Sequence, residues 1–125
     1  METLAPSFSV KRNDAMREVY YTLSGLFSLQ DIDALFSELL KASEPFIHDR
    51  KGFRVLGDLR EFTVQTREVG EKMRLSQETS AKVGVDKMAI VYSSVLLKQQ
   101  FRRVSEALEC EFFESKADAI AWLRQ

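Results

Sequence analysis

Four polar side chains at the end of one apolar stretch are the best candidates in this sequence for chemistry or ligand binding. The stretch "VLG" leads into Asp58, and Arg60, Glu61 and Thr63 follow closely. Ligands of open α/β sheets bind past the carboxyl ends of parallel strands, and this segment is predicted to be such an end. Asp58 could accept hydrogen bonds from a ligand, and Arg60 could pair with an anion. The alternative is that Asp58 only caps the loop by binding backbone N–H groups, while Arg60 and Glu61 are solvated.

A second polar group, Tyr92, Ser93 and Ser94, follows the apolar run "KMAIV". Hydroxyl groups beside the free N–H groups of a helix start could hold an anion. The plainer interpretation is that Ser93 or Ser94 is the N-cap of the next helix. No glycine-rich phosphate-binding pattern accompanies them. We count Ser93 among the candidate binding residues but favour the cap.

His48 is the only histidine and Cys110 the only cysteine. A metal site or a histidine-assisted nucleophile needs partner residues at suitable spacing. His48 has Asp49 beside it but no ligand at helical His-x-x-x-ligand spacing, and Cys110 stands in an apolar context typical of a packed small residue. We therefore expect no metal, no cofactor and no catalytic set. An enzyme that uses the strand end at Asp58, Arg60 and Thr63 is the least favoured of the readings we keep.

The composition is that of an ordinary globular protein. The chain has 125 residues, with 18 basic and 19 acidic side chains and a net charge of −1. The length suits one domain, 1–125. The balanced charge argues against nucleic-acid binding, and no apolar run approaches the roughly 20 residues that a membrane span needs. With one cysteine and no signal-peptide pattern, we expect a cytoplasmic protein.

Hydrophobic periodicity gives the order β-β-α-β-α-β-α-β-α. A turn at "NDA" joins the first two strands as a hairpin, and each later strand is followed by a helix that can cross over, so those strands should be parallel. The expected fold class is α/β, with a single mixed sheet, an antiparallel edge hairpin and four helices packed on it. The strands are expected at 8–13, 17–25, 53–59, 87–93 and 110–115, and the helices at 28–45, 66–83, 97–108 and 116–125.

The helix expected at 66–83 has an unusually weak apolar stripe. A helix held lightly could move, open a groove or serve as a docking face, and we include Met73 among the candidate residues for that reason. The alternative is an ordinary half-exposed helix. The positions of the stripe are Val69, Met73, Ser76 or Gln77, Ser80 and Val83.

Four stretches of the chain carry a family resemblance: "YYTLSGLFSLQDIDAL", "VLGDLREFT", "KMAIVYS" and the C-terminal "CEFFESKADAIAWL". With them the chain resembles the SpoIIAA-like, or STAS/Sec14-like, family from about residue 8 to residue 123. The resemblance implies the fold more strongly than a function. STAS domains of the anti-sigma-factor antagonist type are switched by phosphorylation of a serine in an Asp-Ser motif. This chain keeps Asp58 but lacks that serine and its glycine, and Thr63 and Thr66 are the only hydroxyls nearby.

The resemblance implies two functions of different classes. The first is a non-enzymatic regulatory module that binds another protein, or a second copy, through the region from Asp58 to Met73. The second is a carrier or sensor of a small apolar or amphipathic ligand held between sheet and helices. A protein partner predicts an exposed apolar patch, whereas a carrier predicts an apolar cavity of a few hundred Å³.

Overall fold

A five-stranded sheet with four helices forms the fold of the computed structural model, which describes residues 5–104 and 108–125. The strand order is β1-β2-β3-β4-β5; β1 pairs antiparallel with β2, and the other pairs are parallel. The predicted α/β fold class is confirmed. The elements are β1 (Ser7–Asn13), β2 (Glu18–Gly25), α1 (Leu29–Asp49), β3 (Phe53–Phe62), α2 (Arg67–Val83), β4 (Val85–Val91), α3 (Val95–Val104), β5 (Cys110–Phe113) and α4 (Lys116–Leu123).

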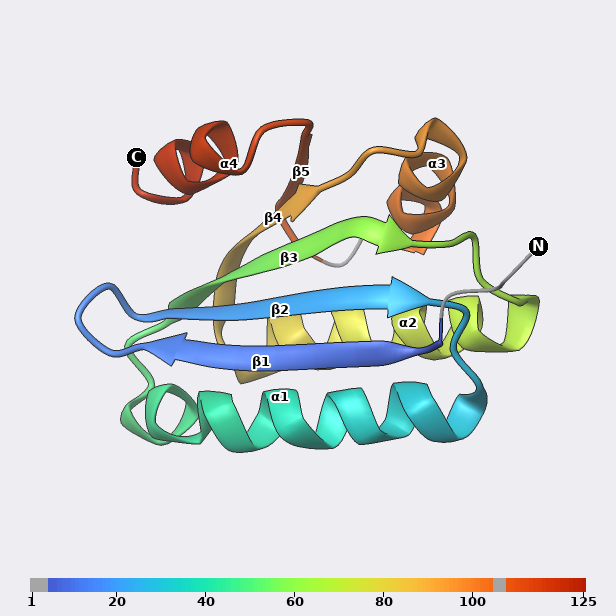
Figure 1. Cartoon of the computed structure of the whole chain (residues 1–125). Helices are drawn as coiled ribbons and strands as arrows, with labels where there is room; N and C mark the ends of the chain where they lie inside the picture. The colour runs from blue at the N-terminus through green and yellow to red at the C-terminus, as the bar shows by residue number, and fades with distance from the viewer. Residues whose placement is uncertain (1–4, 105–107) are drawn as a thin grey trace.

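Helices cover both faces of the sheet: α1, α2 and α3 pack on one face, and α4 packs on the other. Figure 1 shows α1 and α4 on opposite sides of the sheet. Alternate residues of each strand point to opposite faces, so one strand supplies both cores. The larger core joins the sheet to α1, α2 and α3, with Val19, Tyr21 and Leu23 from β2 among its members. The smaller core lies under α4 and consists of Leu56, Ala89, Val91, Ala119 and Leu123.

The strand β3 is longer than the sequence predicted, and this changes the setting of Asp58. We expected the strand to end at residue 59, but it continues to Phe62. Asp58 pairs with Val91, the last residue of β4, and the rest of β3 runs on beside β2 after a bulge. Leu59 and Phe62 are both buried, and this apolar burial keeps the segment extended although it is rich in polar residues. Asp58 therefore lies within a strand and not past its end.

The prediction that Pro45 ends the first helix is wrong. The helix α1 runs on to Asp49 with Pro45 inside it. Pro45 is exposed, so the carbonyl that loses its N–H partner can be hydrated. Beyond it, Phe46 is buried and its ring lies 5.6 Å from that of Phe53. The burial of this last turn outweighs the proline.

Smaller differences concern the later elements, among them β5, which ends at Phe113 and not at residue 115. The strand β4 begins at Val85 and ends at Val91, two residues earlier at each end than predicted. The helix α3 is described to Val104, and residues 105–107 of the expected helix lie outside the described part of the chain. Leu108, expected on the same helical face, lies in a bend and packs against the larger core. Across residues 5–104 and 108–125, no helix is both long and apolar enough to cross a membrane.

Candidate functional site

The carboxylate of Asp58 is bound by the guanidinium of Arg60, two residues along the same strand. Arg60 donates from Nε at 2.9 Å and from Nη2 at 2.7 Å, and its backbone N–H donates at 3.2 Å. These hydrogen bonds from Arg60 lower the pKa of Asp58, although its burial opposes the shift. Asp58 is only 8% exposed. Both of its oxygens therefore accept hydrogen bonds from Arg60, which fixes the conformation of this part of β3.

Ser93 joins the same cluster through the backbone. Its hydroxyl donates to the carbonyl of Arg60 at 2.7 Å, so the segment after β4 is fastened to β3. The N-cap of α3 is Ser94, whose hydroxyl accepts from the N–H of Leu97 at 3.3 Å. The structure therefore brings Asp58, Arg60 and Ser93 together, and the hydrogen bond from Ser93 joins the segment after β4 to β3.

Thr63 connects the end of β3 to the last residue of β2. Its hydroxyl donates to the carbonyl of Gly25 at 3.2 Å, and its N–H reaches the same oxygen at 3.4 Å. Glu61, which pairs with Ser24 in the sheet register, is exposed. Both candidates therefore lie at the carboxyl edge of the sheet, beside but not within the cluster around Asp58.

Gln65 is the centre of this edge, although no local sequence pattern marks it. It is 5% exposed; its Oε1 accepts from the N–H of Phe27 at 2.8 Å, and its Nε2 donates to the carbonyl of Gly25 at 3.1 Å. Its own backbone is held by Gln100 of α3, which accepts from the Gln65 N–H at 2.8 Å and donates to the Gln65 carbonyl at 2.9 Å. Three segments distant in the sequence are thereby tied together.

Exposed apolar side chains occur on the same three segments. We call the following five residues the edge surface. Its members, with their exposed fractions, are Leu26 (42%), Leu29 (43%), Val64 (45%), Val95 (61%) and Leu96 (69%). Isolated exposed leucines need no explanation, but their occurrence on adjoining loops and helix starts at one edge favours an interaction role.

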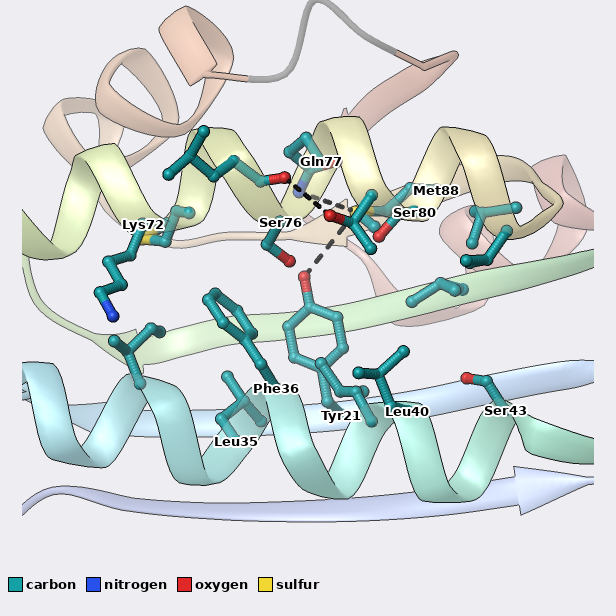
Figure 2. Close-up of a pocket in the computed structure, with 18 of the residues that line it drawn as sticks. Tyr21, Leu35, Phe36, Leu40, Ser43, Lys72, Ser76, Gln77, Ser80 and Met88 are labelled. Carbon is teal, nitrogen blue, oxygen red and sulfur yellow. Dashed lines mark hydrogen bonds between the residues drawn. The ribbon is translucent and has the colours of Figure 1, made fainter. Parts of the chain in front are cut away.

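Met73 belongs to a different site from the other candidates. It is 4% exposed and lines a cavity of about 340 Å³ that lies between α1, α2 and the sheet and is partly open to solvent (Figure 2). Apolar side chains such as Leu35, Phe36 and Val55 make most of its wall. The volume falls within the range of small-molecule sites. The edge surface and the cavity are therefore separate candidates.

The polar groups on one wall of the cavity have weak hydrogen-bond acceptors or no hydrogen-bond partner. The hydroxyl of Tyr21 donates to Sδ of Met88 at 3.8 Å, and Nε2 of Gln77 donates to the same sulfur at 3.5 Å (Figure 2). Sulfur is a weak acceptor. Oε1 of Gln77 is buried without a hydrogen-bond partner, and Gln77 is only 4% exposed. Burial raises the pKa of Tyr21, so its hydroxyl stays protonated.

The rim of the cavity is formed by the two helices. Leu40 of α1 and Leu75 of α2 are 49% and 48% exposed there. Lys72 and Asp33 are the charged residues among the described ones that line the cavity, and they pair with each other at 2.8 Å. The sequence contained a signal for this cavity, because Ser76, Gln77 and Ser80 stand where large apolar residues would fill a helix–sheet interface.

Among residues 5–104 and 108–125, no group of three or more His, Cys, Asp or Glu side chains is arranged to hold a metal ion. His48 lies in the last turn of α1 and is 3.5 Å from Glu44, an exposed neighbour on the same helix. Cys110 opens β5 as a half-buried residue of the larger core.

Comparison with known proteins gives a consistent result for the fold. A family model described as SpoIIAA-like matches residues 19–124. The chain resembles an uncharacterised protein of the DUF3478 family with a SpoIIAA-like fold from Shewanella loihica, at 18% identity and a TM-score of 0.71, with 98% of each chain covered. It also resembles an anti-sigma factor antagonist from Mycobacterium paratuberculosis, at 12% identity and a TM-score of 0.63, covering 97% of this chain and 96% of that one. No curated protein matches significantly.

Proposed function

The chain belongs to the SpoIIAA-like family, and from that premise we propose that it is a cytoplasmic, non-enzymatic regulatory module that binds another protein through the edge surface. One structural neighbour is described as an antagonist of an anti-sigma factor, which is a protein that acts on a protein. The proposal includes no phosphorylation switch, because the sequence lacks the serine and glycine of the Asp-Ser motif after Asp58.

The observation that carries the proposal is the exposure of five apolar side chains on segments that hydrogen bonds hold together. Val95 and Leu96 are the most exposed, at 61% and 69%. The Gln65–Gln100 hydrogen bonds hold their helix against the loop before α2. A pre-ordered apolar surface loses little conformational entropy when a partner covers it, and this favours binding.

Site-specific photocrosslinking in the cells that make the protein tests this function. A benzophenone amino acid replaces Leu96 in one version and Leu40 in another. Both leucines are exposed helix residues, but Leu40 lies at the cavity rim on α1, outside the edge surface. We expect a discrete crosslinked protein from position 96 and none from position 40, and we expect Leu26→Asp to abolish it in the position-96 version.

The mass of the crosslinked product identifies the partner class. A product of two copies of this chain would make the edge surface a homodimer interface, and a heterologous product would identify a separate partner. Equal products from positions 96 and 40, or no product from position 96, would overturn the proposed role of the edge surface.

A second function, a carrier or sensor of a small amphipathic molecule, is favoured by the cavity. A space of about 340 Å³ with a largely apolar wall is ordinarily filled by side chains or by a ligand. The unpartnered oxygen of Gln77 is the specific feature, since buried polar atoms in native proteins are nearly always hydrogen-bonded.

Native mass spectrometry of the protein, captured gently from its source cells, tests this second function. A bound small molecule would appear as an added mass of a few hundred daltons that disappears after denaturation. We expect Met73→Trp, which fills the cavity from α2, to remove the added mass. A wild-type protein that carries no added mass would count against a carrier role.

A further inference from the structure

We propose that the cavity between α1 and α2 recognises an uncharged ligand with a hydroxyl group on an apolar body, and that Gln77 and Tyr21 bind this hydroxyl. The proposal rests on the second function above and names the class of its ligand. It differs from a general affinity for apolar molecules, because it requires a hydrogen-bond donor on the ligand.

The hydrogen-bonding needs of the cavity wall select this chemistry. Oε1 of Gln77 has no donor, and the nearby hydroxyl of Tyr21 and amide of Gln77 share only the sulfur of Met88. Oε1 has almost no accessible surface, so a ligand hydroxyl that accepts from Tyr21 can donate to Oε1 once the Gln77 side chain turns towards the cavity. It also fits Gln77 if the amide turns over, since a hydroxyl both donates and accepts.

The charges around the cavity disfavour a carboxylate at the same place. The charged lining residues in the described part of the chain are Lys72 and Asp33, which already form an ion pair at 2.8 Å. Their side chains are 40% and 55% exposed, so the pair lies at the rim. A carboxylate beside Gln77 would be buried without a cation, and such burial is costly.

The rim suits the apolar end of the ligand. Leu40 and Leu75 expose about half of their surface there, one from each helix. With the hydroxyl bound beside Gln77, an apolar chain that extends towards the rim would cover both leucines. A ligand in the opposite orientation would leave Oε1 of Gln77 unpartnered.

Calorimetric titration with three small probes tests the ligand class. Octanol carries the hydroxyl, and dibutyl ether is its isomer with an acceptor but no donor. Octanoate at pH 8 is an ionised chain of the same length. We expect octanol to bind about fivefold to tenfold tighter than dibutyl ether, the range that one added hydrogen bond to a buried acceptor gives. We expect octanoate to bind more weakly than octanol.

A pair of glutamine variants tests the assigned residue. We expect Gln77→Leu to bring the affinity for octanol down to that for dibutyl ether and to leave the ether unaffected. Gln99→Leu makes the same change at an exposed position of α3 that does not line the cavity. It should leave all affinities unchanged. Tyr21→Phe should also weaken octanol binding, and it provides a second variant if Gln77→Leu does not fold.

The outcomes separate the ligand class from the carrier function. Equal binding of octanol and dibutyl ether to the wild-type protein, or tighter binding of octanoate, would overturn the ligand class and leave a carrier of another molecule. Loss of octanoate binding in Lys72→Gln would then place the charged end at the rim. If no probe binds, the ligand class is overturned, and the added mass in native spectrometry decides the carrier function independently.

Discussion

The ring of Tyr21 lies across Gly57 of the neighbouring strand. The two residues pair in the register of β2 and β3, and a β-carbon at position 57 would overlap Cζ and Oη of the tyrosine. The missing side chain of Gly57 is therefore what lets the Tyr21 hydroxyl reach Met88 and the wall of the cavity. The glycine acts through this close approach and not through an unusual backbone angle.

Gly57→Ala should push the ring of Tyr21 into the cavity. We expect it to lower the free energy of unfolding by about 1–3 kcal/mol, the usual cost of overpacking in a core. Octanol binding should weaken as well, because the hydroxyl of Tyr21 moves. Urea denaturation measures the first effect, and calorimetry the second.

Gly70→Ala is the matched control for this prediction. A β-carbon at Gly70 meets only Nε2 of Gln100, at 3.7 Å, which is ordinary contact. Since Gly70 lies inside α2, alanine should stabilise the protein by up to about 1 kcal/mol through helix propensity. Equal losses of stability in both variants would contradict the role given to Gly57.

Gln100→Ala tests whether the hydrogen bonds between the Gln100 amide and the Gln65 backbone contribute to stability. The N–H and the carbonyl of Gln65 would both lose their partner, and Gln65 is buried. We expect a loss of about 1–3 kcal/mol in the free energy of unfolding, the cost of leaving a buried polar group unsatisfied. Gln99→Ala, at an exposed site on the same helix, should change it by less than about 0.5 kcal/mol. A similar small effect for both would mean that water replaces the Gln100 amide.

The order of elements could be predicted because each helix carries local signals. Ser28 and Asp31 form the expected capping box, and Ser115 caps α4 beside Asp118. The apolar run of β4 is buried on both faces, as a central strand should be. These features depend on neighbouring residues in the sequence, which is why periodicity and caps reveal them.

The candidate site could be predicted only in part, because its geometry depends on long-range contacts. Asp58 and Arg60 are close in sequence, but nothing local shows that they satisfy each other within a strand. The role of Gln65 depends on Gln100 and on the turn after β2, both remote in sequence. The weak apolar stripe of α2 was a local signal for the cavity. The hydrogen-bond partner of Gln77, however, lies on another element.

Pro45→Ala should stabilise the protein, since α1 continues through this residue. Alanine restores the N–H that the helix lacks and removes the clash of the proline ring with the preceding turn. Part of the gain is lost because the unfolded chain becomes more flexible. We expect a net increase of about 1–2 kcal/mol in the free energy of unfolding, measured with urea. Ser37→Ala, at another exposed site on α1, should change it by no more than about 0.5 kcal/mol. A decrease for Pro45→Ala would mean that the proline stabilises the last turn.

Asp49 should give the protein a loss of stability in acid. Arg17 donates to both carboxylate oxygens, at 2.7 and 2.8 Å, and lowers the pKa of Asp49 from 3.8 to about 2. Because the folded-state pKa lies below the unfolded one, the contribution is complete above about pH 4 and is lost as the pH falls towards 2.

We expect Asp49→Asn to lower the melting temperature at pH 5 and to reduce its fall between pH 4 and pH 2. The asparagine cannot ionise, so this part of the proton linkage disappears. Asp49 is a better test than Arg17, because the guanidinium of Arg17 also donates to the carbonyl of Gly52 and lies 4.7 Å from the ring of Phe46. Glu61→Gln, a change at an exposed residue of β3, is the control and should keep the wild-type fall. An unchanged pH dependence in Asp49→Asn would show that the hydrogen bonds of this carboxylate, of which those from Arg17 lower its pKa most, do not control acid stability.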